Sequence, residues 1–452
     1  ATGQVSAQVW VVEDVSQVPP DFPAGQLLVM SHLPPMWLGL MQRASGIVTE
    51  QGGMTSHGAI LARELGIPAV VGVAGATQIL RTGDWVKIDG DRGLVYRLSS
   101  VPDPSPDRFH PEMALLPAVK QEEPGGSLSP RTQTQVMLAL GPSVNLEAVA
   151  SLPSAGVGLL RAEHLLLPLL PQGWGCSKRG GTAPQDALSR EGATELPEEI
   201  GCEEIGCEVV EAIAQKILPI AAAFAPRPVF YRSLDVRSQD FLGALSSSPP
   251  MSPEPNPTLG MHGTFSYTNS PAWFDAELAA LRQVQQAGYA NIRLILPFVR
   301  GVEEVRFCRQ RALEAGLWDA PDFQLWIMAE VPSVLFLLPE LVQAGVQGIA
   351  IGSNDLAQLL LAADRDLPQL SEAFPPRHPA VQRAIQHLVQ TAHQLGIPCT
   401  LCGELPGQHL DLIEEWVRWG IAALCVAPGA ARSVQWAIAR AETVIAEREL
   451  LG

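Results

Sequence analysis

Residues 46–73 read GIVTEQGGMTSHGAILARELGIPAVVGV, and their hydrophobic pattern divides them into three parts. Apolar, β-branched runs at 46–49 and 69–73 predict two short strands, and the stretch 56–65 between them has helical spacing. Gly66 and Pro68 follow that stretch, as is usual where a helix ends. With further strand-like runs at 5–12, 26–31, 85–89 and 93–98, these residues predict a small α/β unit.

One histidine, His57, stands at the start of the predicted helix, behind a glycine pair and the hydroxyls of Thr55 and Ser56. Imidazole is nucleophilic near neutral pH, and the free N–H groups of a helix's first turn favour a bound anion. The position therefore suits a residue that carries a phosphoryl group. The same residues also fit an ordinary glycine loop in which Thr55 or Ser56 caps the helix and His57 has no special role.

Composition limits the possible classes of protein. The chain has 452 residues, enough for two to four domains, and 47% of them are hydrophobic while 17% are charged, which is typical of globular proteins. A formal charge of -17 argues against a nucleic-acid-binding surface. Seven scattered cysteines imply no disulfide framework. We find no membrane-spanning run and no signal peptide, so we expect a cytoplasmic protein without a membrane partner.

From about residue 132 onward, short apolar runs alternate with helical patterns, which favours βαβ units and a parallel sheet. We predict a (β/α)8 TIM barrel, in which reactive groups lie where the strands end. An eighth strand is predicted less clearly, at 259–267. The seven clear strands are at 135–140, 156–160, 229–234, 292–299, 326–329, 348–351 and 398–401.

The predicted organisation has three parts. Residues 1–100 form the small α/β domain, residues 101–131 form a Pro-rich linker, and residues 132–452 form the barrel. Residues 171–207 differ from the rest of the barrel in their glycines, mixed charges and three cysteines, and we interpret them as an insertion.

The nearly continuous string from Gly52 to Gly72 resembles the phosphohistidine swivelling domain of the phosphoenolpyruvate (PEP)-utilising enzymes. This family includes PEP synthase (pyruvate, water dikinase), pyruvate phosphate dikinase and enzyme I of the sugar phosphotransferase system. The resemblance implies that His57 is transiently phosphorylated and that Thr55 helps to bind the substrate. Several later segments resemble the PEP/pyruvate-binding barrel of the same family, and details such as ILPFVR (295–300) lean toward PEP synthase rather than enzyme I.

Two arginines end consecutive predicted strands. Arg161 lies in GVGLLRAE (156–163) and Arg232 in RSLD (232–235), and both segments resemble family strands whose arginines bind the transferring phosphoryl group. Guanidinium offers a planar fork of donors that matches phosphate oxygens and stays charged. For either arginine alone a surface salt bridge is the more common role, but their position at the ends of consecutive predicted strands favours phosphate binding. Arg365 matches a family arginine that holds the substrate, but the triplet 364–366 also fits a solvated surface.

Two carboxylates are candidate metal ligands. Glu330 lies in AEVPS (329–333) and Asp355 in IGSNDL (351–356), and the resemblance assigns Mg²⁺ to both and substrate contact to Asn354. Mg²⁺ prefers carboxylate oxygens together with water and substrate oxygens. A solvent-exposed strand end and a helix N-cap are the ordinary alternatives for these two motifs.

Cys402 lies in TLCGELPG (400–407), and an isolated buried cysteine is usually packing material. The resemblance instead makes Cys402 the acid that protonates carbon 3 of the pyruvate enolate, and the base in the reverse reaction. Gly403 would let the chain pass close to the substrate. Glu404 is expected to orient the site in a way that the sequence does not specify.

The chain departs from the family pattern in two respects. We find no ATP-binding domain and no P-loop pattern, so the chain alone is not expected to charge His57 from ATP without an ATP-grasp domain elsewhere. His262 and Ser266, in NPTLGMHGTFSY (256–267), stand where the family has two arginines. A histidine there can still donate to a phosphate, but the loss of fixed positive charge predicts a weakened enzyme.

The expected function is phosphoryl transfer between His57 and pyruvate enolate or PEP, as in the C-terminal half of PEP synthase. One alternative is a PEP–protein phosphotransferase of the enzyme I type. Another is a non-catalytic regulator that binds PEP or pyruvate. The family also implies a homodimer that forms through the barrel.

Overall fold

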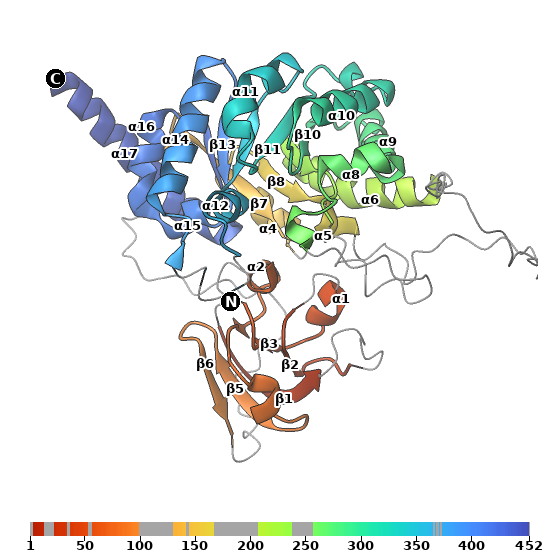
Figure 1. Cartoon of the computed structure of the whole chain (residues 1–452), viewed down its shortest axis with the longest axis vertical. Helices are drawn as coiled ribbons and strands as arrows, with labels where there is room; N and C mark the ends of the chain where they lie inside the picture. Colours follow the sequence, from red (N-terminus) through yellow and green to blue (C-terminus); the bar gives the residue numbers. More distant parts are fainter. Residues whose placement is uncertain are drawn as a thin grey trace, which may run out of the picture.

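The computed structural model describes residues 3–12, 22–33, 37–52, 57–98, 130–141, 144–166, 207–236, 256–364, 367, 370 and 373–451. The predicted linker and the predicted insertion lie outside these residues, apart from residues 130, 131 and 207 at their ends. The described residues form two sheets, one in the N-terminal part of the chain and one in the C-terminal part (Figure 1).

The N-terminal sheet has six strands in the order β4-β3-β2-β1-β5-β6. Strands β1 to β4 pair in parallel, whereas β5 and β6 are antiparallel additions at one side. The central strands β2 and β3 are buried along their whole length because apolar clusters cover both faces of the sheet. The elements are β1 (Gln4–Val12), β2 (Leu27–Met30), α1 (Leu38–Met41), β3 (Gly46–Thr49), α2 (His57–Glu64), β4 (Ala69–Val70), α3 (Ala76–Ile79), β5 (Trp85–Asp89) and β6 (Leu94–Arg97).

The C-terminal sheet is a closed barrel of eight parallel strands, which confirms the predicted TIM barrel. The strands follow the chain order around the barrel, and β14 closes it by pairing with β7. They are β7 (Gln135–Leu140), β8 (Val157–Arg161), β9 (Val229–Arg232), β10 (Ile292–Leu296), β11 (Leu325–Ala329), β12 (Ile349–Gly352), β13 (Cys399–Cys402) and β14 (Ala423–Val426).

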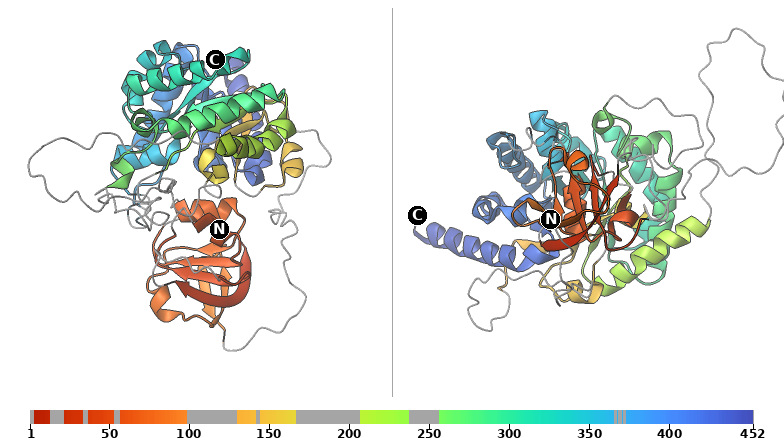
Figure 2. Two further views of the ribbon diagram at one scale, coloured as in Figure 1. Left: turned by 90° about the vertical axis from the view of Figure 1, so that its right-hand side faces the viewer. Right: turned by 90° about the horizontal axis from the view of Figure 1, so that it is seen from below.

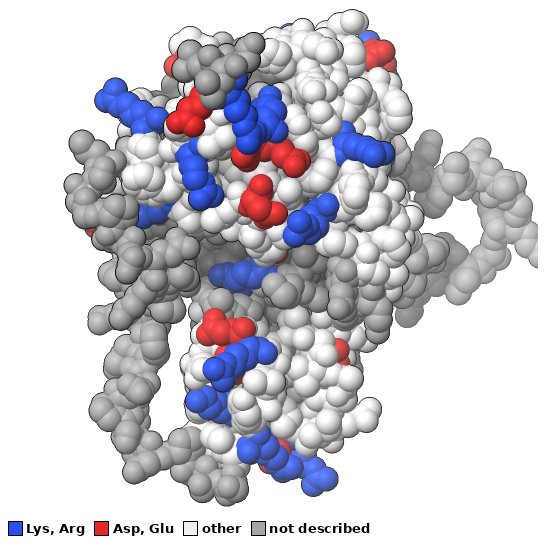
Figure 3. All heavy atoms as spheres, turned by 90° about the vertical axis from the view of Figure 1, so that its left-hand side faces the viewer, with Lys and Arg blue, Asp and Glu red and all other residues white. Residues whose placement is uncertain are grey.

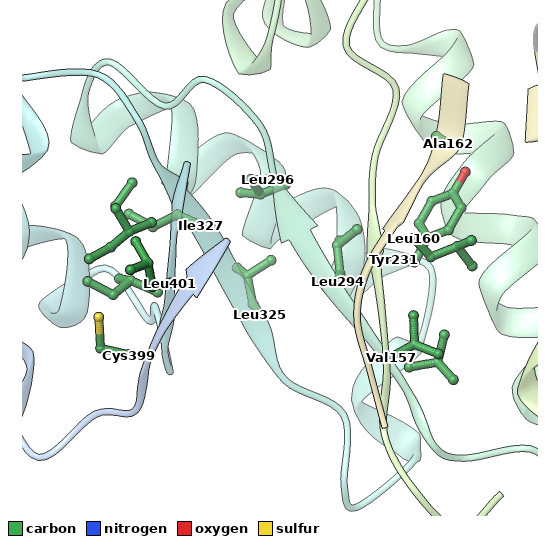
Figure 4. Close-up of a cluster of buried hydrophobic side chains, with 14 of the residues drawn as sticks. Val157, Leu160, Ala162, Tyr231, Leu294, Leu296, Leu325, Ile327, Cys399 and Leu401 are labelled. Atoms are coloured by element: carbon green, nitrogen blue, oxygen red, sulfur yellow. The ribbon is translucent and has the colours of Figure 1, made fainter. Parts of the chain in front are cut away.

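Side chains of the barrel strands alternate between two apolar cores, because successive residues of a strand point to opposite faces. Leu294 and Leu296 of β10 belong to the core between strands and helices, together with the β11 residues Leu325 and Ile327 (Figure 4). Ile295, between the two leucines, belongs to the smaller cluster inside the barrel. Both faces of the strands are therefore apolar, which explains why these runs are continuous in the sequence.

Helices surround the barrel (Figure 2), and α14 shows how each covers it. Its buried residues recur at helical spacing and form one apolar stripe: Val381, Ala384, Ile385, Leu388, Val389 and Ala392. The C-terminal helices are α4 (Leu146–Ala150), α5 (Ala162–Leu166), α6 (Cys207–Phe224), α8 (Thr264–Asn269), α9 (Ala272–Gln286), α10 (Val302–Glu314), α11 (Val334–Gln343), α12 (Ser353–Leu361), α14 (Pro379–Gln394), α15 (Leu405–Gln408), α16 (Ile413–Trp419) and α17 (Ala431–Leu451), with 3-10 turns η3 (Pro257–Leu259), η4 (Leu317–Asp319), η5 (Leu410–Leu412) and η6 (Pro428–Ala430).

The prediction of the eighth strand was wrong. Residues 259–267 contain the end of η3 and the start of α8, in which Thr264 and Tyr267 are buried at a spacing of one helical turn. The eighth strand is β14, a fully buried run of four residues between α16 and η6.

Among the described residues, no helix combines the length and the apolar character that crossing a membrane requires.

Figure 3 shows Lys and Arg side chains interspersed with Asp and Glu on one face of the molecule.

Candidate functional site

The carboxyl ends of the barrel strands bring predicted site residues to one rim. Arg161 ends β8 and lies directly beside Arg232, which ends β9, in the register of the two strands. Glu330 follows β11, Asp355 lies in the first turn of α12 after β12, and Cys402 ends β13. All strands of the barrel run in the same direction, so these five residues share its C-terminal face.

Arg232 is buried among carboxylates. Its side chain is paired with Glu163, and the whole residue is only 8% exposed. Burial alone lowers the pKa of Arg232, but the negative charges of Glu163, Asp235, Glu330 and Asp355 outweigh it and raise the pKa above its ordinary value. Arg232 therefore stays cationic at every physiological pH. The role of Glu163 was not predicted, although it lies only two positions after Arg161 in the segment that we matched to the family.

Glu330 is a carboxylate inside the rim. It is 2% exposed, and its Oε1 accepts a hydrogen bond of 2.9 Å from the backbone N–H of Phe298. Burial, followed by the charge of Asp355, raises the pKa of Glu330 to about 8. Gly352 makes room for it, because a Cβ atom at this position would lie 2.5 Å from Glu330 Oε2.

These acidic groups fit a divalent cation. Two neighbouring carboxylates in a buried site repel one another unless a proton or a cation neutralises them. The side-chain oxygen of Asn354 is buried there and has no hydrogen-bond partner among the described residues. The described part of the chain contains no group of three or more His, Cys, Asp or Glu residues arranged for a metal. A cation here would need water or substrate oxygens as well, which is the usual preference of Mg²⁺.

Cys402 is 1% exposed and belongs to the cluster inside the barrel. Its carbonyl oxygen accepts a hydrogen bond of 2.9 Å from Ser353 Oγ, which joins the end of β13 to the start of α12. Gly403 follows with a φ of 112°, and a Cβ there would lie 2.5 Å from the same Ser353 Oγ. Only glycine allows the chain to pass this close to Ser353 with such a φ.

His262 does not take the place of the expected arginine. It is fully buried, with Nδ1 2.8 Å from Asp235 Oδ1 and Nε2 2.9 Å from the carbonyl oxygen of Thr258. Both ring nitrogens are directed at acceptors within the protein, so the ring is not presented to a phosphate. The sequence had left open that His262 donates to a phosphate, and these contacts correct that interpretation. Ser266 Oγ likewise donates to a backbone carbonyl, that of Gly263, at 2.7 Å.

Arg300 fixes the same segment from the other side. Its guanidinium donates hydrogen bonds of 2.9 Å and 2.8 Å to the carbonyl oxygens of His262 and Gly260. The sequence contained Arg300 in a family-like run, but nothing in that run indicated that its partners are backbone carbonyls. Thr55 and Arg365 lie outside the described residues, as does the side chain of His57, whose backbone begins α2.

One ion pair joins the two parts of the chain. The guanidinium of Arg63, on α2, contacts the carboxylate of Glu404, which follows Gly403 on the barrel rim. Glu404 was expected to orient the site, and the partner in this ion pair lies in the N-terminal part of the chain.

Arginines beside carboxylates on the C-terminal rim of a parallel barrel could bind a phosphorylated substrate together with a divalent cation. Comparison with family models specifies the class. The model described as "PEP-utilising enzyme, PEP-binding domain" matches residues 119–443, and the model described as "PEP-utilising enzyme, mobile domain" matches residues 22–93. The chain belongs to the PEP-utilising enzyme family.

Curated relatives agree with this membership. The phosphoenolpyruvate synthase of Pyrococcus furiosus is 33% identical over 439 residues, which cover 97% of this chain and 49% of the relative. The phosphoenolpyruvate synthase of Aeropyrum pernix is 34% identical over 448 residues, which cover 97% and 51%. That of Synechocystis is 31% identical over 452 residues, which cover 98% and 52%. The chain thus spans about half the length of the curated relatives that it matches.

Proposed function

We propose that this chain transfers a phosphoryl group between His57 and the enolate oxygen of pyruvate, as part of a PEP synthase-like enzyme. The observation that carries the proposal is the shared rim, on which Arg161 and Arg232 lie beside Glu330 and Asp355. This rim offers fixed positive charge for a phosphoryl group and neighbouring negative charge for a cation. The resemblance of residues 52–72 to the phosphohistidine domain supplies His57 as the other phosphoryl carrier.

The two arginines bind the phosphoryl group in this proposal. Arg161 and Arg232 end neighbouring strands, so their guanidinium groups arise from adjacent points of a rigid scaffold. Preorganised donors of this kind stabilise charge on the transferring group without moving during the reaction. Glu163 holds Arg232 in place through their ion pair.

Glu330 and Asp355 would hold Mg²⁺, with Asn354 beside them to contact the substrate. When bound, the cation supplies positive charge that stabilises the enolate oxygen of pyruvate. Cys402 transfers the proton at carbon 3 of the enolate: its thiol gives the proton to form pyruvate, and its thiolate takes one from the methyl group in the reverse direction. The Ser353 hydrogen bond keeps the backbone of Cys402 beside the acidic pair.

Incubation with radiolabelled PEP and Mg²⁺, followed by assay of acid-labile protein phosphate, tests the proposal. We expect the parent chain to be labelled and His57→Ala to remain unlabelled. Glu330→Gln is expected to lower the labelling rate at least about a hundredfold, because it removes one preorganised charge. Glu340→Gln, an exposed carboxylate on α11, serves as the control and should label normally. Equal labelling of His57→Ala and the parent would contradict the mechanism.

A regulator that binds PEP or pyruvate without turnover is the second candidate. It is favoured by the segment at 256–267, where His262 and Ser266 bond to the protein itself and offer no fixed positive charge to a ligand. Calorimetry separates the two functions, because a regulator binds PEP with Mg²⁺ yet acquires no acid-labile phosphate. The cytoplasmic location and the homodimer remain predictions.

A further inference from the structure

Helix α2 carries His57 at its first residue and Arg63 near its other end. In Figures 1 and 2, α2 lies on the side of the N-terminal unit that faces the barrel. The Arg63 guanidinium contacts the Glu404 carboxylate there, and the two side chains are only 29% and 15% exposed. The helix whose first residue is the candidate phosphate carrier therefore also contacts the barrel.

Glu404 lies on the barrel at the point where α2 contacts it. It follows Cys402 by two residues and precedes α15. One of its carboxylate oxygens, Oε1, contacts Arg63, while the other, Oε2, accepts a hydrogen bond of 3.1 Å from Gln408 Nε2 on α15. The backbone before it is fixed by the close approach of Gly403 to Ser353. The carboxylate thus has a defined position at the edge of the candidate active site.

We propose that the Arg63–Glu404 ion pair is the contact that docks the histidine-bearing unit on the mouth of the barrel. This inference rests on the proposed function. An α-helix rises about 1.5 Å per residue, so the backbone of His57 lies about 9 Å along the helix axis from Arg63. Fixing Arg63 at Glu404 consequently limits how far the start of α2 can lie from the rim that carries Cys402.

The strength of such a contact suits a unit that must dock and leave. A single ion pair that is partly exposed contributes little to stability, because water and salt screen it and two long side chains lose freedom. Two like charges in the same place repel one another and disfavour docking strongly. The pair therefore selects the docked position without locking it, and added salt should weaken docking.

A charge exchange tests the proposal. We compare Arg63→Glu, Glu404→Arg and the double variant that carries both substitutions, with Arg43→Glu and Glu415→Arg as exposed charge-reversal controls in the two units. Each single reversal is expected to slow PEP-dependent labelling at least about tenfold relative to its control. The double variant should recover to within a few-fold of the parent, because the two charges again attract. PEP affinity measured by calorimetry should stay unchanged in Arg63→Glu and in the two control variants.

Small-angle scattering of the same proteins gives a second result that does not depend on activity. The single reversals should increase the radius of gyration, and the double variant should restore it. If the single reversals match their controls in both measurements, or if the double variant is no better than the singles, the docking contact is wrong. If the parent itself takes no label, the proposed function fails, and the scattering series still decides whether the two residues dock the units.

Discussion

The position of Gly403 imposes two requirements that only glycine meets together. Its φ is 112°, and an added Cβ would lie 2.5 Å from Ser353 Oγ. Gly403→Ala should therefore lower the free energy of unfolding by at least about 1–3 kcal/mol, from backbone strain and the displaced serine. It should also weaken PEP binding, since Ser353 connects Cys402 to the start of α12. Urea unfolding and calorimetry measure the two effects.

Gly288→Ala is the matched control for this prediction. Gly288 has a similar φ of 99°, but nothing lies within 4 Å of an added Cβ. It should show the backbone strain alone and leave PEP binding unchanged. If the two variants behave alike, the contact with Ser353 has no part in the site.

Some residues of the candidate site could be predicted from the sequence, whereas the partners of others could not. Arg161, Glu330 and Cys402 were predicted as site residues because each directly follows a predicted strand, and Arg232 because it lies near the end of one; strand ends of a parallel barrel meet on one face. The sequence showed that His262 stands where the family has an arginine and left open that it donates to a phosphate. Its partners Asp235 and Thr258 come from the fold, and only the structure shows that they occupy both ring nitrogens.

Glu277 connects two elements that support the rim. This residue of α9 is 1% exposed and accepts hydrogen bonds of 2.7 Å from Tyr231 Oη and 3.0 Å from the backbone N–H of Leu234. Tyr267 holds the same segment, because its hydroxyl donates a 2.6 Å hydrogen bond to the Leu234 carbonyl oxygen and its Oη also lies 3.0 Å from Ser233 Oγ. The chain that leaves β9 between Arg232 and Asp235 is thereby bonded to α9 and α8.

The free energy of unfolding should depend on pH through Glu277. Burial raises its pKa from 4.5 to about 8, against the opposing effect of its hydrogen bonds. Between these values the folded chain keeps a proton that the unfolded chain releases, so stability should fall as pH rises from about 5 to about 8. Glu277→Gln cannot ionise and should reduce this slope, measured by urea unfolding at several pH values.

Glu330 contributes in the same direction, since its pKa is also raised to about 8, so some slope should remain in Glu277→Gln. Glu340→Gln, at an exposed position, should keep the full slope of the parent. A slope in Glu277→Gln equal to that of the parent would show that Glu277 has no raised pKa in the folded protein.

At the level of elements, the hydrophobic pattern predicted the strands that are flanked by clear turn signals, including β3 with its observed bounds. It missed β14 because a buried run of four residues between two helices has no periodicity of its own. It also misread α8, whose apolar residues Phe265 and Tyr267 alternate as in a strand. In both cases the closure of the whole sheet, and not the local sequence pattern, determines which segment forms the eighth strand.

The whole barrel is self-contained in its packing. Its main apolar core consists of residues between Val136 and Ala441, and β14 closes the sheet on β7. A fragment of residues 130–452 should therefore fold cooperatively and bind PEP with Mg²⁺ within a few-fold of the parent, yet remain unlabelled. Circular dichroism melting and calorimetry measure these properties. A fragment without a cooperative transition would show that the N-terminal unit is needed for folding.

Contacts between distant parts of the chain were beyond prediction. Arg63 and Glu404 lie in motifs that the sequence showed clearly, but each motif alone is consistent with many partners. Their pairing depends on how the two units, each with its own sheet, lie relative to each other. The same holds for Arg232 and Glu163, whose pairing requires β8 and β9 to be neighbours.

The closure of the barrel also determines where another chain can add a β-strand to the described part of this protein. A sheet that closes on itself exposes no row of unsatisfied backbone groups to another molecule. The N-terminal sheet, by contrast, ends in β4 and β6, and β6 displays the exposed side chains of Leu94 and Tyr96. In concentrated or crowded solution, self-association by strand addition should therefore begin at β6, where a lysine in place of either side chain would suppress it.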